Sequence, residues 1–395
     1  MNPTATHPQW LFIAAAKGLQ GYVLRSDPLK EMIGASELIE RLPRTAKEDF
    51  LRQVLDQLGL KPEVLTDAAG AARMLFQSWD EAARLARLWP LLASQFAPGL
   101  EMSVAVVEVQ DGQLGDAIET AEREINTNRN FPAASLPEAG PWVARNRRTG
   151  LPAVARVPAL DEEDRARNQS DAVDDESRRK REAAGETAQN TLLAKIIPER
   201  FNQAFNPNTG HPSAKDRWTP DLTKLATNES SYLAIIHADA NGLGVAMMKC
   251  ISALGNKLEA PETYRQLCQA IDDASRWAAQ KAMATLLDKT EQEIRKYPHG
   301  QVFVPIRPLV CAGEDFTCII RAEHAVRFAQ QAGQQDESGL CHLPSACRLR
   351  SLRHVQPEEP VGGFDRHAGN PEAADLHGAA RHRRPDHGLR AERVG

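Results

Sequence analysis

The chain has 395 residues, of which 42% are hydrophobic, and its formal net charge is only −5. A chain of this length can bury more than one hydrophobic core, so we expect two or three domains. The near-balanced charge excludes a chain-wide basic surface for nucleic acid, and any such contact would need a local basic patch.

Residues 9–130 predict the order strand, helix, strand, strand, helix, strand, helix. The apolar run at 10–16 has strand length, and small residues at 67–72 suit a tight hairpin between two short strands. Apolar residues recur at helical spacing elsewhere. The expected elements are strands at 10–16, 63–66, 73–76 and 102–109, and helices at 18–24, 29–58, 79–95 and 114–125. This is the split βαβ plan, a largely antiparallel sheet with helices on one face.

Residues 131–230 interrupt this regularity, and we interpret them as a connector. The segment 161–182 alternates acidic and basic residues and includes the basic quartet at 178–181, which is typical of an exposed helix. The quartet has the charge to contact phosphates, but a solvated charged face is the favoured interpretation. We assign no site to it.

From Tyr232 the strand-then-helix order begins again. The expected elements are strands at 232–237, 301–310 and 316–320, and helices at 242–248 and 264–287. This is the first half of the N-terminal plan, so residues 231–333 are predicted to form a second, incomplete domain. The expected fold class is α+β.

Residues 334–395 show no helical periodicity and contain nine arginines without any lysine. We expect this tail to be disordered, or to be the product of a frameshift between residues 331 and 337. Reading the gene in its other two frames would test the second hypothesis.

Two motifs of the second domain place acids beside glycines at the ends of apolar runs. One contains Asp239, and the other contains Glu314 and Asp315. Carboxylates from neighbouring strands are what two divalent ions require during nucleotidyl transfer. Gly242 and Gly244 would let phosphate oxygens approach backbone N–H groups at a helix start. Taken singly, Asp239 is equally well explained as a helix cap, and the Gly-Glu-Asp turn as an exposed hairpin tip.

The two halves of the chain can be compared with each other. Matching Gly18 to Gly242 sets Ala15 opposite Asp239. Matching the pair at 69–70 to the pair at 312–313 sets Ala71 and Ala72 opposite Glu314 and Asp315. On this comparison the first domain has lost every acid of the second, although chance similarity of two small-residue segments is the alternative.

The motifs at 238–244 and 312–316 resemble those of GGDEF-like palm domains, especially in the large subunit of type III CRISPR effector complexes. Residues 17–24 and 29–39 resemble the opening of that family's first, catalytically degenerate palm. The resemblance implies two ferredoxin-like palms that bind ATP and join it into cyclic oligoadenylate in antiviral defence. It also implies the other subunits of an RNA-guided complex as partners, with guide and target RNA contacted indirectly.

The resemblance also implies roles for single residues. The catalytic residues and ligands of Mg²⁺ or Mn²⁺ would be Asp239, Glu314 and Asp315. Gly313 would allow close approach of the ribose and α-phosphate. The remaining nucleotide-binding positions would be Ala240, Asn241, Gly242 and Gly244 in the second palm and Gly34, Ala35 and Ser36 in the first.

The sequence departs from the family pattern in three places. No His-Asp dipeptide occurs, so the nuclease domain of many members is not expected. Residues 141–153, where the family often binds zinc, contain no cysteine, and none of the six cysteines forms a Cys-x-x-Cys pair, so we expect no zinc. Ala-Gly-Glu-Asp replaces the usual Gly-Gly-Asp-Asp, and Asn241 stands where a second acid is frequent, which predicts reduced activity.

These observations predict an ATP-using nucleotidyltransferase, with a weak or inactive nucleotide-binding scaffold subunit as the alternative. A stand-alone cyclase that uses GTP is a third, weaker hypothesis. No stretch approaches the length of a membrane span, and the N-terminus lacks a signal-type pattern. We therefore expect a cytoplasmic chain without membrane contact.

Overall fold

The computed structural model describes most of the chain between residues 9 and 333. Its gaps fall at residues 27, 69, 111–112, 131–139, 161–165, 186–187, 210–213, 215, 220, 227–231, 239–242, 255–259, 298–301 and 313–314. The tail at 334–395 lies outside the described residues. No described helix combines the length and the apolar character that a membrane span requires.

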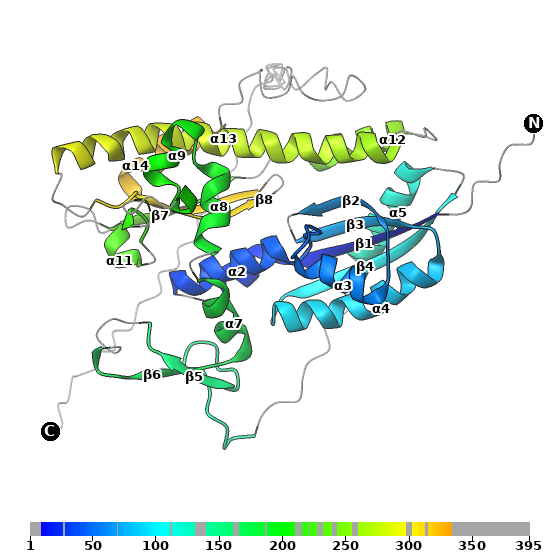
Figure 1. Ribbon diagram of the computed structural model, residues 1–395, viewed down its shortest axis with the longest axis horizontal. Helices are drawn as coiled ribbons and strands as arrows, with labels where there is room; N and C mark the ends of the chain where they lie inside the picture. Colours follow the sequence, from blue (N-terminus) through cyan, green and yellow to red (C-terminus); the bar gives the residue numbers. More distant parts are fainter. Residues whose placement is uncertain are drawn as a thin grey trace, which may run out of the picture. The chain divides into compact units, whose positions relative to one another are not determined.

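The first repeat runs from β1 to α5 and contains a four-stranded antiparallel sheet (Figure 1). Its elements are β1 (Gln9–Lys17), α1 (Leu19–Leu24), α2 (Leu29–Arg41), α3 (Phe50–Leu58), β2 (Glu63–Ala68), β3 (Ala71–Phe76), α4 (Trp79–Phe96), β4 (Glu101–Val109) and α5 (Leu114–Asn128). The strand order is β2-β3-β1-β4. This is the ferredoxin-like order, and the expected α+β class with antiparallel sheets and helices is confirmed.

Both faces of the first sheet are buried, which explains why β1 is apolar at almost every position. Phe12, Ala14 and Ala16 face the core formed with α1 to α4. Leu11, Ile13 and Ala15 face a second core. The helices that connect the strands therefore lie on one face, as expected. The other face is covered by α5 and, in addition, by two helices of the second repeat.

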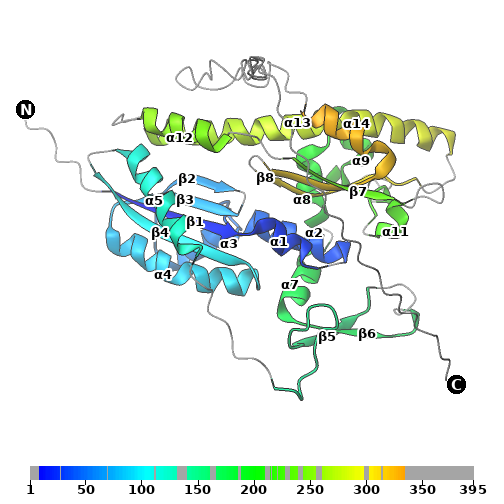
Figure 2. The ribbon, with the colours of Figure 1, turned by 180° about the vertical axis from the view of Figure 1, so that it is seen from behind.

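The second repeat contains a three-stranded antiparallel sheet in the order β7-β9-β8 (Figure 2). Its described elements are β7 (Leu233–Ala238), α12 (Leu243–Leu254), α13 (Ala260–Lys296), β8 (Ile306–Ala312), β9 (Asp315–Arg321) and α14 (Ala322–Gly333). This order corresponds to β1-β3-β2 of the first repeat. The expected repetition of the first half of the plan is therefore present in the described residues.

Helix α13 spans 37 residues and packs against both sheets. Its first turns carry Ala260 and Tyr264 into the second core of the first sheet. Its later turns carry Ala279, Met283 and Leu287 into the core of the second sheet. One helix thus supplies apolar surface to both repeats.

A β-bulge occurs at the same place in the two sheets. The pairing of β2 with β3 shifts between Val64 and Thr66. The pairing of β8 with β9 shifts between Pro308 and Val310. Each bulge ends two residues before the last residue of its strand, and each hairpin then closes through a two-residue loop. A bulge is a position-specific device, so its recurrence supports an internal repeat over chance similarity.

The first part of the connector packs against the first repeat, and its later part packs in the core of the second repeat. Its elements are short. They are β5 (Ala155–Pro158), β6 (Ser170–Val173), α7 (Asp175–Ala183), α8 (Ala188–Ile196), α9 (Asn202–Phe205), α11 (Leu222–Leu225) and the 3₁₀ turns η2 (Glu199–Phe201) and η3 (Pro207–Thr209). Strands β5 and β6 pair in an antiparallel ribbon, and α7 packs against α2.

The expectation that the basic quartet forms a solvated face is wrong for two of its members. Lys180 is fully buried, and its Nζ donates to the carbonyl oxygen of Tyr22 at 2.7 Å and to Glu176 Oε1 at 2.6 Å. Arg181 donates from Nε to Glu31 Oε1 at 2.7 Å. Charge alternation alone cannot reveal these partners, because Tyr22 and Glu31 lie about 150 residues earlier in the chain.

A hydrogen-bond network holds the connector segment 141–153, which contains no cysteine, against the start of α7. Asp174 caps α7 by accepting from the Ser177 backbone N–H at 2.9 Å. Its other carboxylate oxygen accepts from Asn146 Nδ2 at 2.7 Å and from Thr149 Oγ1 at 2.6 Å. Burial opposes ionisation of Asp174, but these hydrogen bonds outweigh it and lower its pKa.

Replacing Asp174 by alanine should lower the free energy of unfolding by about 2–3 kcal/mol, because the helix cap is lost and buried donors are left unpaired. Urea unfolding checks this, with Asp175→Ala as the neighbouring control at a half-exposed carboxylate. Since the pKa of Asp174 is lowered on folding, its contribution should disappear as the pH falls through that pKa. Equal losses in the two variants would contradict the prediction.

Candidate functional site

The described residues include only part of the predicted site. Asp239, Ala240, Asn241, Gly242, Gly313 and Glu314 lie outside them. Asp315 is the first residue of β9, Gly244 belongs to α12, and Gly34, Ala35 and Ser36 belong to α2. The predicted roles of all these residues stay predictions, and the strands around them define where the site would lie. The part of the chain that the structure describes contains no cluster of three metal-ligating side chains.

The strand ends of the second sheet bring the two acidic motifs toward one edge. Ala238, the last residue of β7, pairs with Phe316 of β9. Ala312, the last residue of β8, pairs with Asp315. In this antiparallel sheet β7 thus ends one residue before Asp239, beside the start of β9. We therefore expect the carboxylates of Asp239 and Asp315 to start from adjacent backbone positions.

The first sheet carries small residues at the corresponding positions. Ala15 pairs with Ala71, and Ala68 pairs with Ala71 across a two-residue loop that contains Gly70 at φ +70°. Superimposing the two hairpins by their pairing matches Ala71 to Asp315. The sequence comparison, which matched Ala72 to Asp315, is therefore wrong by one residue.

The shift of one residue arises because the sequence comparison aligned the two glycines. Counted along the sequence from the paired strand ends, Gly70 precedes Ala71 as Glu314 precedes Asp315, and Gly313 has residue 69 as its counterpart. The conclusion about chemistry does not change. The first repeat still has no acid at any position that corresponds to Asp239, Glu314 or Asp315.

A polar contact beside this edge links the two repeats. His237 lies one residue before the end of β7, and its Nδ1 lies 3.0 Å from Thr317 Oγ1 on β9. Gln20 of α1 places its Nε2 at 3.0 Å from His237 Nε2. Sequence reasoning missed Gln20 and His237, although His237 stands within the first acidic motif. The contact brings the start of α1 to the end of the strand that precedes Asp239.

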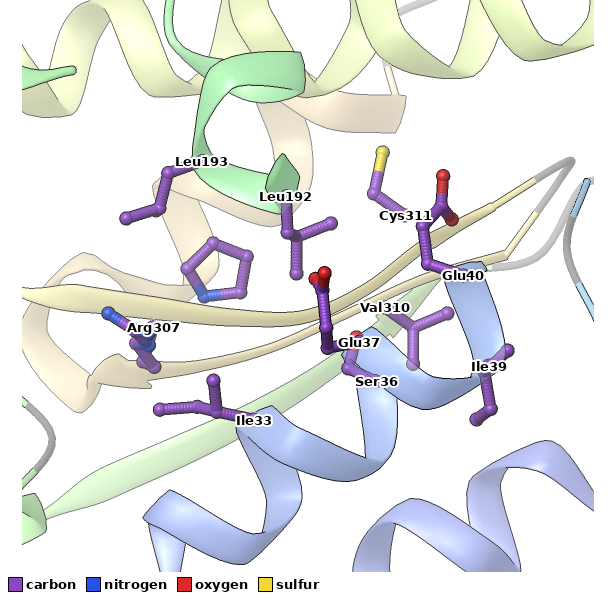
Figure 3. Close-up of a pocket in the computed structure, with 11 residues that line it drawn as sticks. Ile33, Ser36, Glu37, Ile39, Glu40, Leu192, Leu193, Arg307, Val310 and Cys311 are labelled. Atoms are coloured by element: carbon purple, nitrogen blue, oxygen red, sulfur yellow. The ribbon is translucent and has the colours of Figure 1, made fainter. Parts of the chain in front are cut away.

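Two of the three predicted residues on α2 are packed within the protein. A Cβ added to Gly34 would lie 1.7 Å from the backbone oxygen of Lys180, so only glycine fits where α2 crosses α7. Ala35 is fully buried in the first core. Ser36 instead lines a small cavity beside Val310 and Cys311, on the strand that leads to Gly313 and Glu314 (Figure 3).

Glu37, beside Ser36 on α2, is buried with an exposed fraction of 4%. Burial raises its pKa to about 7, although the guanidinium of Arg41 opposes the shift. The unfolded chain releases this proton near pH 4.3. The folded protein therefore binds the proton more tightly, and its stability falls as the pH rises from about 4.3 through about 7.

Replacing Glu37 by glutamine should remove this decline, which amounts to roughly 4 kcal/mol between pH 4.3 and 7 at 1.36 kcal/mol per pKa unit. The measurement is the free energy of unfolding in urea at several values between pH 5 and 7.5. Glu124→Gln, on the exposed side of α5, serves as the control and should leave the slope unchanged. A Glu37→Gln variant with the wild-type slope would show that another group is responsible.

Comparison with known proteins gives no match to a protein-family model and none to a curated protein. Among solved structures, the chain is similar to a Csm1–Csm4 cassette in complex with one ATP, with 14% identity and a TM-score of 0.47 over 83% of this chain and 48% of that one. It is also similar to Csm1 from T. onnurineus, with 13% identity and a TM-score of 0.43 over 83% and 46%.

A third similar structure is the Csm1–Csm4 subcomplex of the type III-A CRISPR-Csm interference complex. The identity is 14% and the TM-score is 0.46, over 82% of this chain and 47% of that one. The chain thus spans less than half the length of these proteins. Identities this low, with TM-scores below 0.5, do not assign a function to it.

Proposed function

We propose that this chain is a nucleotidyltransferase of a type III CRISPR effector large subunit, which joins ATP into cyclic oligoadenylate at the second repeat. The observation that carries the proposal is the contrast between the two hairpins. Asp315 stands at the position that Ala71 occupies in the first repeat, and β7 ends at Ala238, one residue before Asp239. Two equivalent sheets, of which one keeps its acids, are typical of a duplicated fold in which one copy retains the chemistry.

The donor set fits a hard divalent cation, because Asp239, Glu314 and Asp315 offer only carboxylate oxygens. Mg²⁺ or Mn²⁺ bound there would neutralise the charge that develops on the phosphate oxygens. Backbone N–H groups at the start of α12, near Gly242 and Gly244, would bind phosphate. In the reaction a ribose 3′-hydroxyl attacks the α-phosphorus of a second ATP. A new P–O bond forms there as the bond to pyrophosphate breaks.

Gln20 and His237 join the first repeat to the catalytic edge of the second, so the two repeats would act together. Their hydrogen bond lies two residues from Asp239 in the sequence. We propose that the first repeat borders the second nucleotide here and that Ser36 contributes to the same border. The other subunits of an RNA-guided complex are the proposed partners, and guide and target RNA would act through them.

A catalytically weak scaffold subunit is the second candidate. Asn241 replaces an acid, and Glu314 has a longer side chain than the aspartate usual at its position, so the ligand geometry would change. On this proposal the chain binds ATP but turns it over slowly or not at all, while it keeps its place in the complex.

The test is incubation of the purified complex with ATP and Mg²⁺ or Mn²⁺, with and without target RNA, followed by pyrophosphate assay and mass spectrometry of the products. Pyrophosphate with cyclic oligoadenylate supports the enzyme. ATP binding in equilibrium dialysis without pyrophosphate supports the scaffold. A parallel series with GTP identifies the base, and preferential release of pyrophosphate from GTP would overturn the proposed substrate.

A further inference from the structure

A small cavity lies among α2, α8 and β8 (Figure 3). Its free volume is about 20 Å³, which is of the order needed for a single water molecule or monoatomic ion. Ile33 and Leu193 give it apolar walls, whereas Ser36, Glu37 and Arg307 contribute polar atoms. Arg307 lies at the end of the cavity farther from the acidic hairpin along β8, whereas Cys311 and Ser36 lie toward the proposed nucleotide site.

Arg307 differs from other buried arginines of the described chain. Its exposed fraction is 2%. Its Nε and Nη1 atoms donate a hydrogen bond to no described residue. Arg181 is paired with Glu31, and Arg321 with Glu323 and the carbonyl oxygen of Leu225. Buried donors without an acceptor are rare in proteins. Arg307 therefore presents two unmet donors beside the cavity.

The charge of Arg307 is also uncompensated. Burial lowers its pKa to about 10, so the guanidinium stays protonated at neutral pH. A buried and unpaired charge destabilises a fold by several kcal/mol. A single water would satisfy a donor, but it would leave the positive charge in place.

Among the described residues, no carboxyl offsets the charge of Arg307, since burial alone shifts its pKa. The nearby carboxyls belong to Glu37 and Glu40. Glu40 already accepts from Arg44 and Lys195, and burial raises the pKa of Glu37 to about 7, where half of it is neutral. Arg41 lies 3.9 Å from Glu37. Both carboxyls are therefore paired with other cations or partly neutral, and neither is paired with Arg307.

We propose that this cavity is an anion site in which Arg307 binds one small monovalent anion of about the size of chloride. The free volume excludes phosphate and nucleotides, and the unmet groups are donors, which excludes a metal cation. The anion would contact the second repeat through β8 and lie against α2 of the first. It would therefore stabilise the contact between the two repeats, independently of any nucleotide chemistry.

Thermal unfolding in sodium chloride and in sodium gluconate at equal ionic strength tests the proposal, because gluconate is too large for the cavity. The melting temperature of the wild type should be about 2–5 °C higher in chloride. The melting temperature of Arg307→Met should not be higher in chloride than in gluconate. In gluconate it should melt at or above the wild-type temperature, because an apolar side chain replaces an unpaired charge.

Arg321→Met is the matched control, since Arg321 is a buried arginine of the same sheet with its own partners. This variant should have a lower melting temperature than the wild type in both salts. Its melting temperature should still be higher in chloride than in gluconate. The proposal is overturned if the wild type shows no gain, or if Arg307→Met keeps it.

Bromide provides a second readout that does not depend on the folding of any variant. Crystals of the wild-type protein grown in sodium bromide should show an anomalous scattering peak within about 3.5 Å of the Arg307 guanidinium, at hydrogen-bonding distance for this larger ion. Density for water only, without an anomalous signal, would overturn the proposal.

Discussion

Replacing Asp315 by asparagine should reduce pyrophosphate release from ATP by at least about 100-fold. Loss of an outer-shell partner of a metal ligand already costs 10–100-fold, and Asp315 is proposed to be a ligand itself. The amide keeps the size of the side chain but removes the charge that a divalent cation requires. Single-turnover assays with the assembled complex measure the effect.

The control for this experiment is Asp116→Asn, at an exposed carboxylate in the first turn of α5. It should leave turnover unchanged and alter stability by only a few tenths of a kcal/mol. If Asp315→Asn and the wild type release pyrophosphate equally, the second repeat is not the catalytic centre. If neither releases any while both bind ATP, the scaffold proposal is favoured.

Replacing Gly34 by alanine should destabilise the fold by about 3 kcal/mol or more, although alanine is the better helix former. The added methyl group would lie 1.7 Å from the carbonyl oxygen of Lys180, which is a backbone atom that cannot rotate away. Relief would require α7 to move off α2, and this movement would strain the buried Lys180–Glu176 pair. Chemical unfolding of the purified chain measures the loss.

Gly21→Ala is the matched control, because Gly21 lies in helix α1 and an added Cβ meets nothing within 4 Å. This variant should be neutral or stabilised by up to about 1 kcal/mol. The two variants also distinguish two roles of Gly34, which are packing against α7 and contact with the nucleotide. A Gly34→Ala variant of wild-type stability with weakened ATP binding would contradict packing as its role and favour the predicted nucleotide contact.

The elements with strong periodicity could be predicted from the sequence. The strand at 10–16 and the helix at 79–95 agree with β1 and α4 to within two residues. The long helix was predicted at 264–287 but extends over Ala260–Lys296, because its last turns are polar and stabilised by pairs such as Arg295 with Glu291. The strand predicted at 301–310 begins only at Ile306, after Pro305, which cannot donate to the ladder.

For the candidate site, residue type is what carries information in the sequence. Acids beside glycines mark Asp315 and its neighbours as candidates, and their roles stay predictions. The exact match between the two hairpins could not be predicted, because it depends on backbone pairing across a loop in which the glycine has moved by one position. Arg307 gives no sequence signal either, because its Nε and Nη1 lack an acceptor among the described residues only once distant segments enclose it.

The sharing of α13 by two sheets has a consequence for synthesis on the ribosome. Leu65 of β2 belongs to the same core as Tyr264 of α13, and about 200 residues separate the two in the chain. At a synthesis rate of 5–20 residues per second, α13 is made roughly 10–40 seconds after β2. During this interval part of its apolar face stays open to water, which makes the nascent first repeat a natural substrate for chaperones.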